Sequence, residues 1–575
     1  MPLLSRYLKN AVVTFNRRYQ QTQAKVQVPT QLPGGPAFRN AQCFADRIAV
    51  RDNIASYTYA NIFLSAHNLS KKITSLVNGR RNERILFLCP NDANYVITLW
   101  AIWMAGQIAV PLSPLHPKNI LLYYANDTNS KLLITTSKYA ELMQKVSKNT
   151  HSALYVLDDK LKLNCAQQPP LQSQSELEGG QPLDFYDNSN ALILYTSGTT
   201  ASPKGVVLTH KNIQSQVSTL LDAWKWTSND VLLHTLPLHH VHGIVNALLC
   251  PLTVGAKTIM LKKFNANTVW SYLLGVSPVP DDRKITVYMA VPTIYSKLLD
   301  EYKKVFKDDP KMVDYIKNTL KNKIRLMISG SSPLPISTYE KWLEISGHRL
   351  LERYGMTETG MVLSNPYDSD REPGYVGIPL PGVSVRLAEE GETSEQLKTI
   401  VECVNDNGIL VFNKYKDGSP KGELLVKSDG VFKEYYNRPD ATFKEFTADG
   451  WFKTGDISEY STEKKKFKIL GRKDVDIIKS GGYKVSALEI ETHLLAHPDI
   501  KECAVVGVND EQWGQKVCAI VVPQEGKEVT LQTLVEWTEP KVPKYCLPTE
   551  IKVTNALPKN AMGKVSKKEL VKLMF

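Results

Sequence analysis

The stretch from 190 to 212 constrains the fold of this chain more than any other. It reads Asn-Ala-Leu-Ile-Leu-Tyr over 190–195, then a polar loop over 196–205, then Val-Val-Leu over 206–208. A short apolar run beside Gly and Pro predicts a buried strand, and the polar residues from Thr209 predict a helix start. We therefore expect a strand, a loop and a helix in succession, as in α/β folds.

The loop in this stretch has the residue types that bind phosphate. Five Ser or Thr hydroxyls, two glycines and Lys204 occur between Tyr195 and Val206. Glycines let backbone N–H groups approach a phosphate, and a lysine adds a point charge that suits polyphosphate. No Gly-Lys-Ser/Thr ends the loop, which disfavours a P-loop kinase or GTPase. The loop predicts a polyphosphate site, and an ordinary surface loop is the alternative.

The composition is typical of a soluble enzyme with more than one domain. The 575 residues are 43% hydrophobic and 22% charged, and a chain of this length exceeds what one core usually holds. The formal net charge of +12 favours solubility and also attracts anionic ligands. The eight cysteines include no Cys-x-x-Cys pair, which predicts reduced thiols and no structural zinc.

The first 45 residues differ from the rest in charge. Lysines and arginines are interleaved with apolar residues there, and no acid precedes Asp46. This pattern predicts a mitochondrial transit peptide and a matrix location, and a disordered basic tail is the alternative. The longest apolar stretch, 96–106, is too short to span a membrane and predicts a buried helix.

Strand-like and helix-like segments alternate along the chain. This alternation favours an α/β fold in which a parallel sheet is covered by helices. The last hundred residues contain a glycine turn, a strand and a helix that starts at Ser486, which predicts a second, smaller α/β domain. Apolar strands are expected over 84–89, 130–136, 153–157, 503–508 and 517–522.

Five motifs follow one another in the sequence. They are the loop ending in Lys204, Gly330-Ser-Ser-Pro-Leu-Pro335, Tyr354-Gly-Met-Thr-Glu358, Trp451-Phe-Lys-Thr-Gly-Asp456 with Arg472 after it, and Gly563-Lys564. In this order they resemble the acyl-adenylate-forming superfamily of acyl-CoA synthetases, luciferases and peptide-synthetase adenylation domains. The resemblance runs from about residue 40 to 570. One departure is Ala201, where that family usually has glycine.

The resemblance implies an ATP site with a bound Mg²⁺. Tyr354 would pack on adenine, Asp456 would accept the ribose hydroxyls, and Glu358 would hold Mg²⁺, a hard cation that prefers carboxylate oxygen. Without the family, Thr357-Glu358 could also be part of a capping box. The residues that match the family's ATP positions are Thr196, Ser197, Gly198, Thr199, Thr200, Ala201, Ser202, Pro203, Lys204, Gly330, Ser331, Ser332, Glu352, Tyr354, Thr357, Asp456, Arg472 and Lys564.

The resemblance also implies a reaction in two halves. A carboxylate would attack the α-phosphorus of ATP to give an acyl-AMP, and the thiol of coenzyme A would then displace AMP. Lys564, Glu358 and Lys204 would be the catalytic residues of the first half. Asp474 would be the hinge between the halves, and Gly481 and Gly482 would form the turn used in the thioester step.

This family pattern divides the chain into three segments. Residues 1–40 are the expected transit peptide or disordered basic segment. Residues 41–473 are the expected multi-sheet adenylation domain with the ATP and acyl pockets. Residues 474–575 are the expected small mobile α/β domain that carries Lys564.

The segment Leu236-Pro-Leu-His-His-Val-His-Gly243 has three histidines within four residues. A zinc site is disfavoured, because no cysteine lies near and the flanking Leu-Pro and Gly argue against a helix that presents His at i and i+4. In the superfamily, the matching segment lies beside the acyl pocket. We therefore expect His242 in the pocket and structural roles for His239 and His240.

Arg353, which precedes the stacking tyrosine, is the residue that indicates which acid is used. The superfamily often has a neutral or small residue there. A guanidinium fits a second carboxylate bidentately, whereas a buried arginine without an anion is costly. The run Glu352-Arg-Tyr-Gly-Met-Thr-Glu-Thr-Gly-Met361 closely resembles that of malonyl-CoA synthetases, with Met356 capping a short pocket. An outward-facing Arg353 paired with an acid is the alternative.

The main hypothesis is ATP-dependent ligation of malonate, and of methylmalonate, to coenzyme A. The expected partners are these small molecules, with no nucleic acid, no membrane span and no carrier-protein domain. One alternative is a medium- or long-chain fatty acyl-CoA synthetase on the same scaffold. An enzyme that loads a carrier protein and a non-catalytic nucleotide-binding scaffold are the others.

Overall fold

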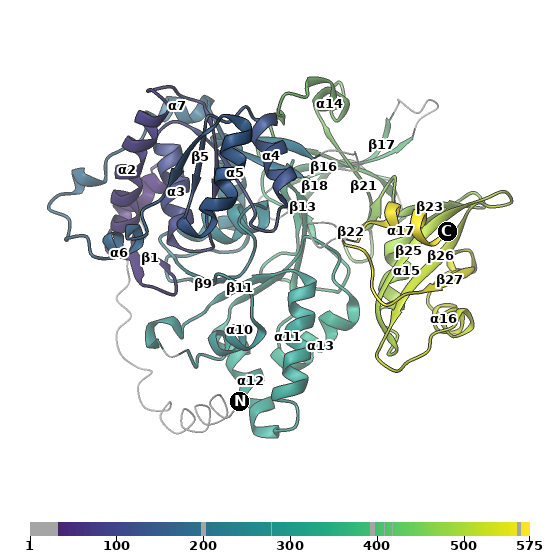
Figure 1. Cartoon of the computed structure of the whole chain (residues 1–575). Helices are drawn as coiled ribbons and strands as arrows, with labels where there is room; N and C mark the ends of the chain where they lie inside the picture. Colours follow the sequence, from purple (N-terminus) through teal and green to yellow (C-terminus); the bar gives the residue numbers. More distant parts are fainter. Residues whose placement is uncertain are drawn as a thin grey trace. The chain divides into compact units, whose positions relative to one another are not determined.

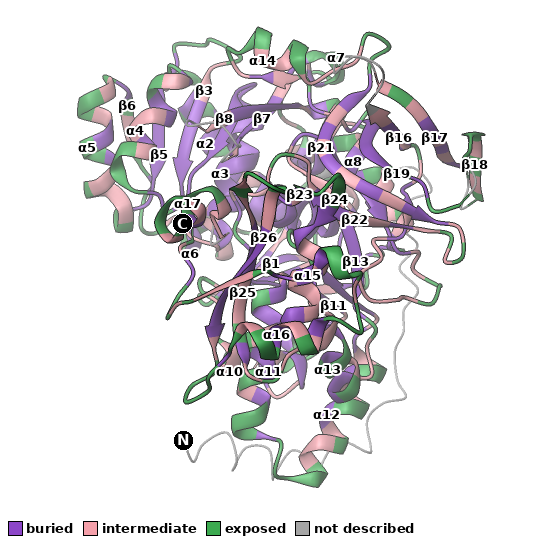
Figure 2. Ribbon diagram, turned by 90° about the vertical axis from the view of Figure 1, so that its right-hand side faces the viewer, coloured by how far each residue is buried: buried purple, intermediate pink, exposed green. Residues whose placement is uncertain are grey.

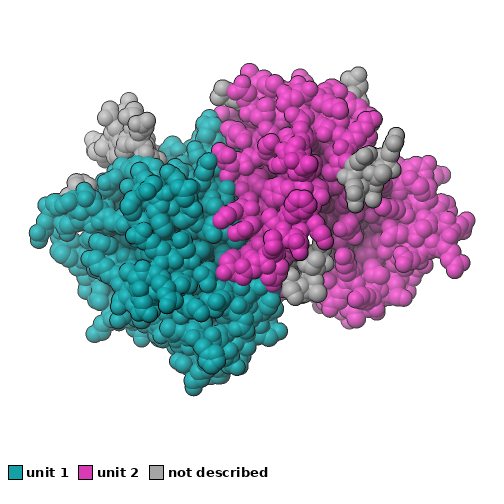
Figure 3. Space-filling view, turned by 90° about the horizontal axis from the view of Figure 1, so that it is seen from above, with its two compact units in different colours: residues 1–196, 205–328, 342–348 teal, residues 197–204, 329–341, 349–575 magenta. Residues whose placement is uncertain are grey.

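The computed structural model describes residues 33–196, 203–277, 279–390, 397–406, 409–416, 418–559 and 565–575. The chain forms two compact units, shown in two colours in Figure 3. Unit 1 consists of residues 1–196, 205–328 and 342–348, and unit 2 of residues 197–204, 329–341 and 349–575. In unit 1 the first described helical turn, η2 (Ala37–Cys43), buries Phe38 and Asn40, so the folded part already includes these residues.

One sheet of unit 1 is built around the predicted strand at 190–195. Its strand order is β8-β7-β4-β3-β5-β6, and each pairing from β7 to β6 is parallel. The strands are β3 (Arg84–Leu88), β4 (Ile108–Pro111), β5 (Leu132–Thr135), β6 (Ala153–Val156), β7 (Asn190–Thr196) and β8 (Lys204–Thr209). Helices α3 (Ala93–Met104), α4 (Lys118–Asp127), α5 (Ala140–Thr150) and α8 (His210–Ala223) connect or follow them (Figure 1).

The predicted helix start after this sheet is confirmed in detail. Thr209 accepts a hydrogen bond from the backbone of Asn212, whose side chain accepts one from the backbone of Thr209. This reciprocal cap supplies acceptors for two N–H groups that a helix start leaves unpaired. The predicted buried helix is α3, in which every residue except Asn94 is buried.

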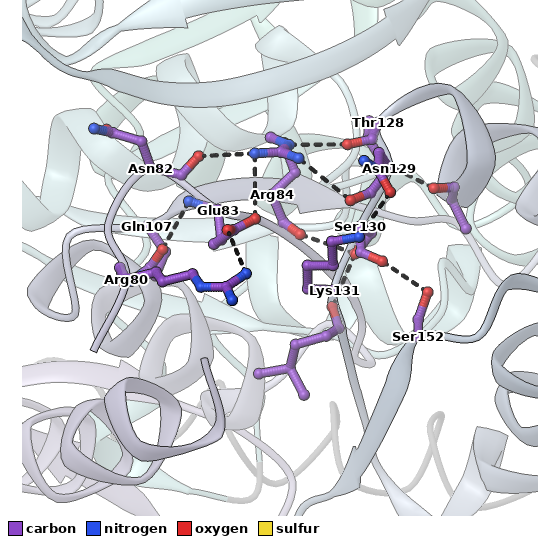
Figure 4. A network of polar contacts seen from close by, with 12 residues as sticks. Arg80, Asn82, Glu83, Arg84, Gln107, Thr128, Asn129, Ser130, Lys131 and Ser152 are labelled. Carbon is purple, nitrogen blue, oxygen red and sulfur yellow. Dashed lines mark hydrogen bonds and ion pairs between the residues drawn. The ribbon is translucent and has the colours of Figure 1, made fainter. Parts of the chain in front are cut away.

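Polar side chains form hydrogen bonds near the starts of the strands in this sheet (Figure 4). Nε of Arg84 donates to the carbonyl of Thr128 at 2.9 Å, and Oγ of Ser130 donates to the carbonyl of Arg84 at 2.8 Å. Gln107 accepts a hydrogen bond from the backbone N–H of Glu83 at 2.9 Å. These contacts satisfy backbone groups that the parallel ladder leaves unpaired at the end of the sheet.

A second sheet contributes strands to unit 1 in the order β12-β11-β9-β10-β1-β2. The pairings of β11, β9, β10 and β1 are parallel, and β2 is antiparallel to β1. Its strands are β1 (Ile48–Arg51), β2 (Ser56–Thr58), β9 (Val231–His234), β10 (Lys257–Met260), β11 (Val287–Ala290) and β12 (Leu326–Ser329). Its helices include α2 (Tyr59–Leu76), α10 (Ala266–Leu273), α11 (Pro292–Val305) and α12 (Pro310–Lys323).

A buried ion cluster joins three distant segments of unit 1. Nζ of Lys162, in α6 (Leu161–Ala166), lies 3.0 Å from Oδ2 of Asp52 and 2.9 Å from Oδ2 of Asp92. The Asp52 side chain has 0% exposure and the Asp92 side chain has 2%. Charges this deeply buried persist only when they are paired.

Unit 2 contains three arrangements of strands, of which the first two are antiparallel and the third adds β27 in parallel to β26. A short ladder consists of β13 (Leu351–Met356), β14 (Gly360–Ser364) and β15 (Ile378–Pro379). The second arrangement is a sheet in the order β18-β17-β16-β19-β21-β22. Its strands are β16 (Ser384–Glu390), β17 (Leu397–Asp406), β18 (Ile409–Lys414), β19 (Lys421–Lys427), β21 (Phe452–Ser461) and β22 (Lys466–Arg472).

The third arrangement is the small α/β body predicted at the C-terminal end. Its strands are β23 (Ile477–Ser480), β24 (Tyr483–Ser486), β25 (Ile500–Asp510), β26 (Gly514–Pro523) and β27 (Glu550–Val553). Its helices are α15 (Ala487–Leu494), α16 (Leu531–Thr538) and α17 (Lys567–Met574). Side chains of α15, β25 and β26 form its apolar core, seen as buried segments in Figure 2. Ser486 caps α15 as predicted, by accepting from the N–H of Glu489.

Candidate functional site

Three residues predicted to bind the nucleotide lie together in unit 2. The Tyr354 hydroxyl donates a hydrogen bond to Oδ2 of Asp456, and Nε of Arg472 lies 2.9 Å from Oδ1 of the same carboxylate. Asp456 and Arg472 also face each other in the β21–β22 ladder. Burial, and then the Asp456 charge, raises the pKa of Tyr354. Both oxygens of the carboxylate predicted to bind ribose are therefore engaged within the protein.

Glu358 and Lys204 share one neighbour, Tyr435. The Tyr435 hydroxyl donates to Oε1 of Glu358 at 2.9 Å, and Nζ of Lys204 lies 4.5 Å from the centre of the Tyr435 ring. Nζ of Lys204 is also 3.8 Å from Oε1 of Glu445. Tyr435 thus contacts two predicted catalytic residues. Its hydroxyl contacts Glu358, and its ring contacts Lys204.

The surroundings of Glu358 fit the predicted Mg²⁺. Glu358 is 6% exposed, and burial raises the pKa of its carboxyl group. A bare negative charge is therefore costly there, and a divalent cation would offset that cost. Among the described residues, no group of three or more His, Cys, Asp or Glu side chains could hold a metal by itself. The phosphates of a nucleotide would supply the other ligands, as is usual for Mg²⁺.

Arg353 is buried, and no described carboxylate forms an ion pair with it. It is 5% exposed, and within the described part of the chain its Nε and Nη2 atoms have no hydrogen-bond partner. Burial lowers the pKa of its guanidinium to about 9. The sequence left open an outward-facing Arg353 paired with an acid, and the structure contradicts that alternative. A buried guanidinium with unused donors is suited to bind a carboxylate from a ligand.

The guanidinium of Arg353 lies in the space that a side chain at residue 330 would fill. A Cβ at residue 330 would lie 2.6 Å from both Nε and Nη1 of Arg353. The family resemblance placed Gly330 among the ATP-binding residues, and this contact gives a separate reason for a glycine there. In the same turn Ser331 has φ of 71°, a left-handed conformation that costs energy for residues other than glycine. Ser331 and Ser332 are both exposed.

Glu352 is turned away from the neighbouring arginine. It precedes Arg353 in β13, and successive side chains of a strand point to opposite faces. Its Oε1 accepts a hydrogen bond from the N–H of Gly374 at 2.9 Å, and burial raises its pKa to about 8. Glu352 is buried, and its contact with ATP stays a prediction.

The predicted hinge and thioester turn lie in consecutive turns. Asp474 is exposed in the turn between β22 and β23. Gly481 and Gly482 have φ of 54° and 83°, which L side chains rarely adopt. The N–H of Gly481 donates to the carbonyl of Trp513 at 2.9 Å. The geometry explains why both turn positions are glycine, and the hinge role of Asp474 stays a prediction.

Several other predicted residues are placed individually. Met356 and Thr357 are half-buried beside Glu358, and Thr196 is half-buried at the end of β7. His242 is buried in unit 1 and begins the helical segment η5 (His242–Leu249), whereas His239 and His240 precede that segment, so no helix presents these histidines at i and i+4. Pro203 is half-buried. The remaining predicted residues, which are Ser197, Gly198, Thr199, Thr200, Ala201, Ser202 and Lys564, lie outside the described residues.

The sequence reasoning missed another largely buried cation of unit 2, Lys567, whose side chain is 11% exposed. Its Nζ lies 2.6 Å from Oδ1 of Asp476 and 2.6 Å from Oε1 of Glu491. Asp476 also accepts a hydrogen bond from the N–H of Arg472 at 3.0 Å. Burial lowers the pKa of Lys567, but the two carboxylates more than offset this effect and raise it overall. No local pattern distinguishes Lys567 from the other lysines near the end of the chain.

Two family models match the sequence. The model described as AMP-binding enzyme covers residues 37–436, and the model described as AMP-binding enzyme C-terminal domain covers residues 489–564. The predicted α/β fold, with a large first part and a small C-terminal part, is confirmed by these matches and by the structures below. Among the described residues, no helix has the length and apolarity that a membrane crossing needs.

Individual proteins are similar along nearly the whole chain. The mitochondrial malonate–CoA ligase ACSF3 of Mus musculus is 44% identical over 544 residues, covering 94% of this chain and 91% of its own. Malonate–CoA ligase of Arabidopsis thaliana is 38% identical, covering 93% and 88%. The crystal structure of ATP-bound MatB from Rhodopseudomonas palustris superimposes with a TM-score of 0.77 at 30% identity, covering 94% and 99%.

Proposed function

Because this chain belongs to the AMP-binding enzyme family, we propose that it ligates malonate to coenzyme A. In the first half-reaction, a malonate carboxylate attacks the α-phosphorus of ATP, and pyrophosphate leaves. In the second, the thiol of coenzyme A attacks the acyl carbon of malonyl-AMP, and AMP leaves. Relatives named malonate–CoA ligase support this choice of acid and thiol.

The observation that carries the proposal is the buried guanidinium of Arg353, two of whose nitrogens have no partner among the described residues. Malonate has two carboxylates, of which one reacts and one is left to be held. Nε and Nη2 of Arg353 are buried donors without a partner among the described residues, and they can donate two hydrogen bonds to that second carboxylate. A fatty acid has no second anion, so its binding would leave the guanidinium buried and uncompensated. This argument favours malonate over the fatty acyl alternative.

The residues of this chain act mainly by positioning and by stabilising charge. Arg353 would hold the unreactive carboxylate, and Lys204 would neutralise charge on the departing pyrophosphate. Glu358 would hold a Mg²⁺, which when bound neutralises phosphate charge. Lys564 would lie between the reacting carboxylate and the α-phosphate. No protein nucleophile is required, because the acid itself attacks the phosphorus.

The second half-reaction would use a different part of the C-terminal segment. Rotation of the C-terminal segment about Asp474 would move Lys564 away from the acyl-AMP. The same rotation would bring the turn at Gly481 and Gly482 to it. The exposed position of Asp474 and the left-handed glycines of the turn support this proposal. Such conformational steps often limit turnover.

We extend the proposal to a second substrate and to a location. Methylmalonate differs from malonate by one methyl group, and one methyl group in a pocket usually discriminates weakly. The basic, acid-poor residues before Asp46 and the relatives named mitochondrial support import into mitochondria, with the matrix as the proposed compartment.

The test is AMP release that depends on both ATP and coenzyme A, with acetate, octanoate, palmitate, malonate, methylmalonate and succinate as acids. We expect malonate to be used best and Arg353→Ala to abolish that preference. Arg349→Ala is the matched control, because the Arg349 side chain is 51% exposed. Turnover of octanoate or palmitate in preference to malonate would reject the pocket assignment. No AMP release with any acid would favour a non-catalytic nucleotide-binding scaffold.

A further inference from the structure

Tyr435 occupies a position that no motif in the sequence indicated. It ends the short strand β20 (Glu434–Tyr435) and is 5% exposed. Its backbone N–H donates to Oγ1 of Thr442 at 2.9 Å, and its ring packs against Phe432 with centroids 4.8 Å apart. The position of Tyr435 is therefore fixed by a hydrogen bond from its backbone and by packing of its ring against Phe432.

The segment that contains Tyr435 also holds both ends of Glu358. The backbone N–H of Phe432 donates to the backbone carbonyl of Glu358 at 2.6 Å, and the Tyr435 hydroxyl donates to Oε1 at 2.9 Å. One carboxylate oxygen is thus fixed by the protein, which sets the direction in which the carboxylate presents its other oxygen. A ligand carboxylate oriented by a second residue binds its metal more tightly than an unoriented one.

The same side chain restrains the charged end of Lys204. Nζ lies 4.5 Å from the centre of the Tyr435 ring and 3.8 Å from the carboxylate of Glu445. A lysine side chain has several rotatable bonds, and an aromatic ring beneath the ammonium group reduces its freedom without neutralising its charge. The hydroxyl of Tyr435 therefore acts on Glu358, while its ring acts on Lys204.

We propose that Tyr435 is a positioning residue that couples Glu358 to Lys204, so that the metal-binding carboxylate and the phosphate-binding lysine approach one nucleotide together. The inference rests on the proposed binding of ATP but not on the identity of the acid. Two substitutions separate the two contacts. Tyr435→Phe removes the hydrogen bond and keeps the ring, whereas Tyr435→Leu removes both.

The test is calorimetric titration of the full-length protein with ATP, once with Mg²⁺ and once with EDTA. For Tyr435→Phe we expect MgATP to bind about tenfold more weakly, the effect of losing one hydrogen bond to a charged group, with ATP in EDTA unchanged. For Tyr435→Leu we expect ATP in EDTA to bind about threefold more weakly as well. The control is Tyr436→Phe, at the neighbouring half-buried tyrosine, which should change neither titration.

The outcomes distinguish this inference from the proposed function. If the unsubstituted protein binds MgATP and Tyr435→Phe binds it equally well, the coupling role is wrong and the proposed function stands. An equal loss by Tyr435→Phe in Mg²⁺ and in EDTA would also overturn the coupling role, because it would indicate a general structural effect. If the unsubstituted protein binds no ATP, the proposed function itself fails.

Discussion

Two largely buried cations of unit 2 have opposite surroundings. Lys567 has two carboxylates within 2.6 Å, whereas Arg353 has none among the described residues. Burial is unfavourable to both charges, yet the pKa of Lys567 is raised and the pKa of Arg353 is lowered to about 9. The difference indicates that Lys567 completes the fold of its region, while Arg353 is left for an anion from outside the protein.

The largest expected effect is the loss of activity when Arg353, which has no anionic partner among the described residues, is replaced. We expect Arg353→Met to lower kcat/KM for malonate about a thousandfold, because a buried bidentate ion pair with the substrate is lost. The free energy of unfolding should stay the same or rise, since no carboxylate in the described part of the chain loses a partner. Steady-state kinetics and urea denaturation measure the two effects. A large loss of stability would mean that Arg353 serves the fold as Lys567 does.

The opposite pattern is expected for the paired cation. Lys567→Met should lower the free energy of unfolding by about 3 kcal/mol, because Asp476 and Glu491 would be left buried without a cation. Lys568→Met, at the exposed neighbouring residue, is the control and should change stability by less than about 0.5 kcal/mol. Equal stabilities of the two variants in urea would show that the cluster at Lys567 is not structural.

A smaller effect should come from displacing Arg353 rather than removing it. In Gly330→Ala the new methyl group would meet the guanidinium, which is the flexible end of its side chain, so the fold should survive while the arginine shifts. We expect kcat/KM for malonate to fall between about tenfold and a hundredfold, as for a misplacement of about 1 Å. In an Arg353→Met background, Gly330→Ala should add nothing. An additive loss in the double variant would contradict an effect exerted through Arg353.

The smallest effect concerns pH. Because the pKa of Arg353 is about 9, the guanidinium loses its charge as pH rises through that value. We expect kcat/KM for malonate in ATP–pyrophosphate exchange, which involves no thiol, to fall about fivefold between pH 9 and 10. The kcat should fall less, because a bound carboxylate raises the pKa again. If Arg353→Met shows the same basic limb, another group is responsible.

Local features of this protein could be predicted from the sequence. The strand at 190–195, the helix after Thr209 and the cap at Ser486 depend on neighbouring residues only, and all three are observed. The helical segment that begins at His242 was not predicted. Its second residue, Gly243, has no side chain, which lets the backbone approach the carbonyl of Pro237 closely.

Contacts between distant segments could not be predicted in this way. The burial of Arg353 against Gly330 joins residues from different elements, and no periodicity in the sequence encodes that contact. Tyr435 contacts Glu358 across 77 residues, and nothing distinguishes it locally from Tyr436 beside it. The motifs indicated which residues carry the chemistry, but the residues that orient them depend on tertiary packing.

The ion cluster at Lys162 has a consequence for the kinetics of folding. Lys162 lies 110 residues from Asp52 and 70 from Asp92, so long loops must close before the three charges can meet. We expect the cluster to form after the rate-limiting step, because removing three charges from water is favourable only once all three are paired. Its loss should then speed unfolding more than it slows refolding.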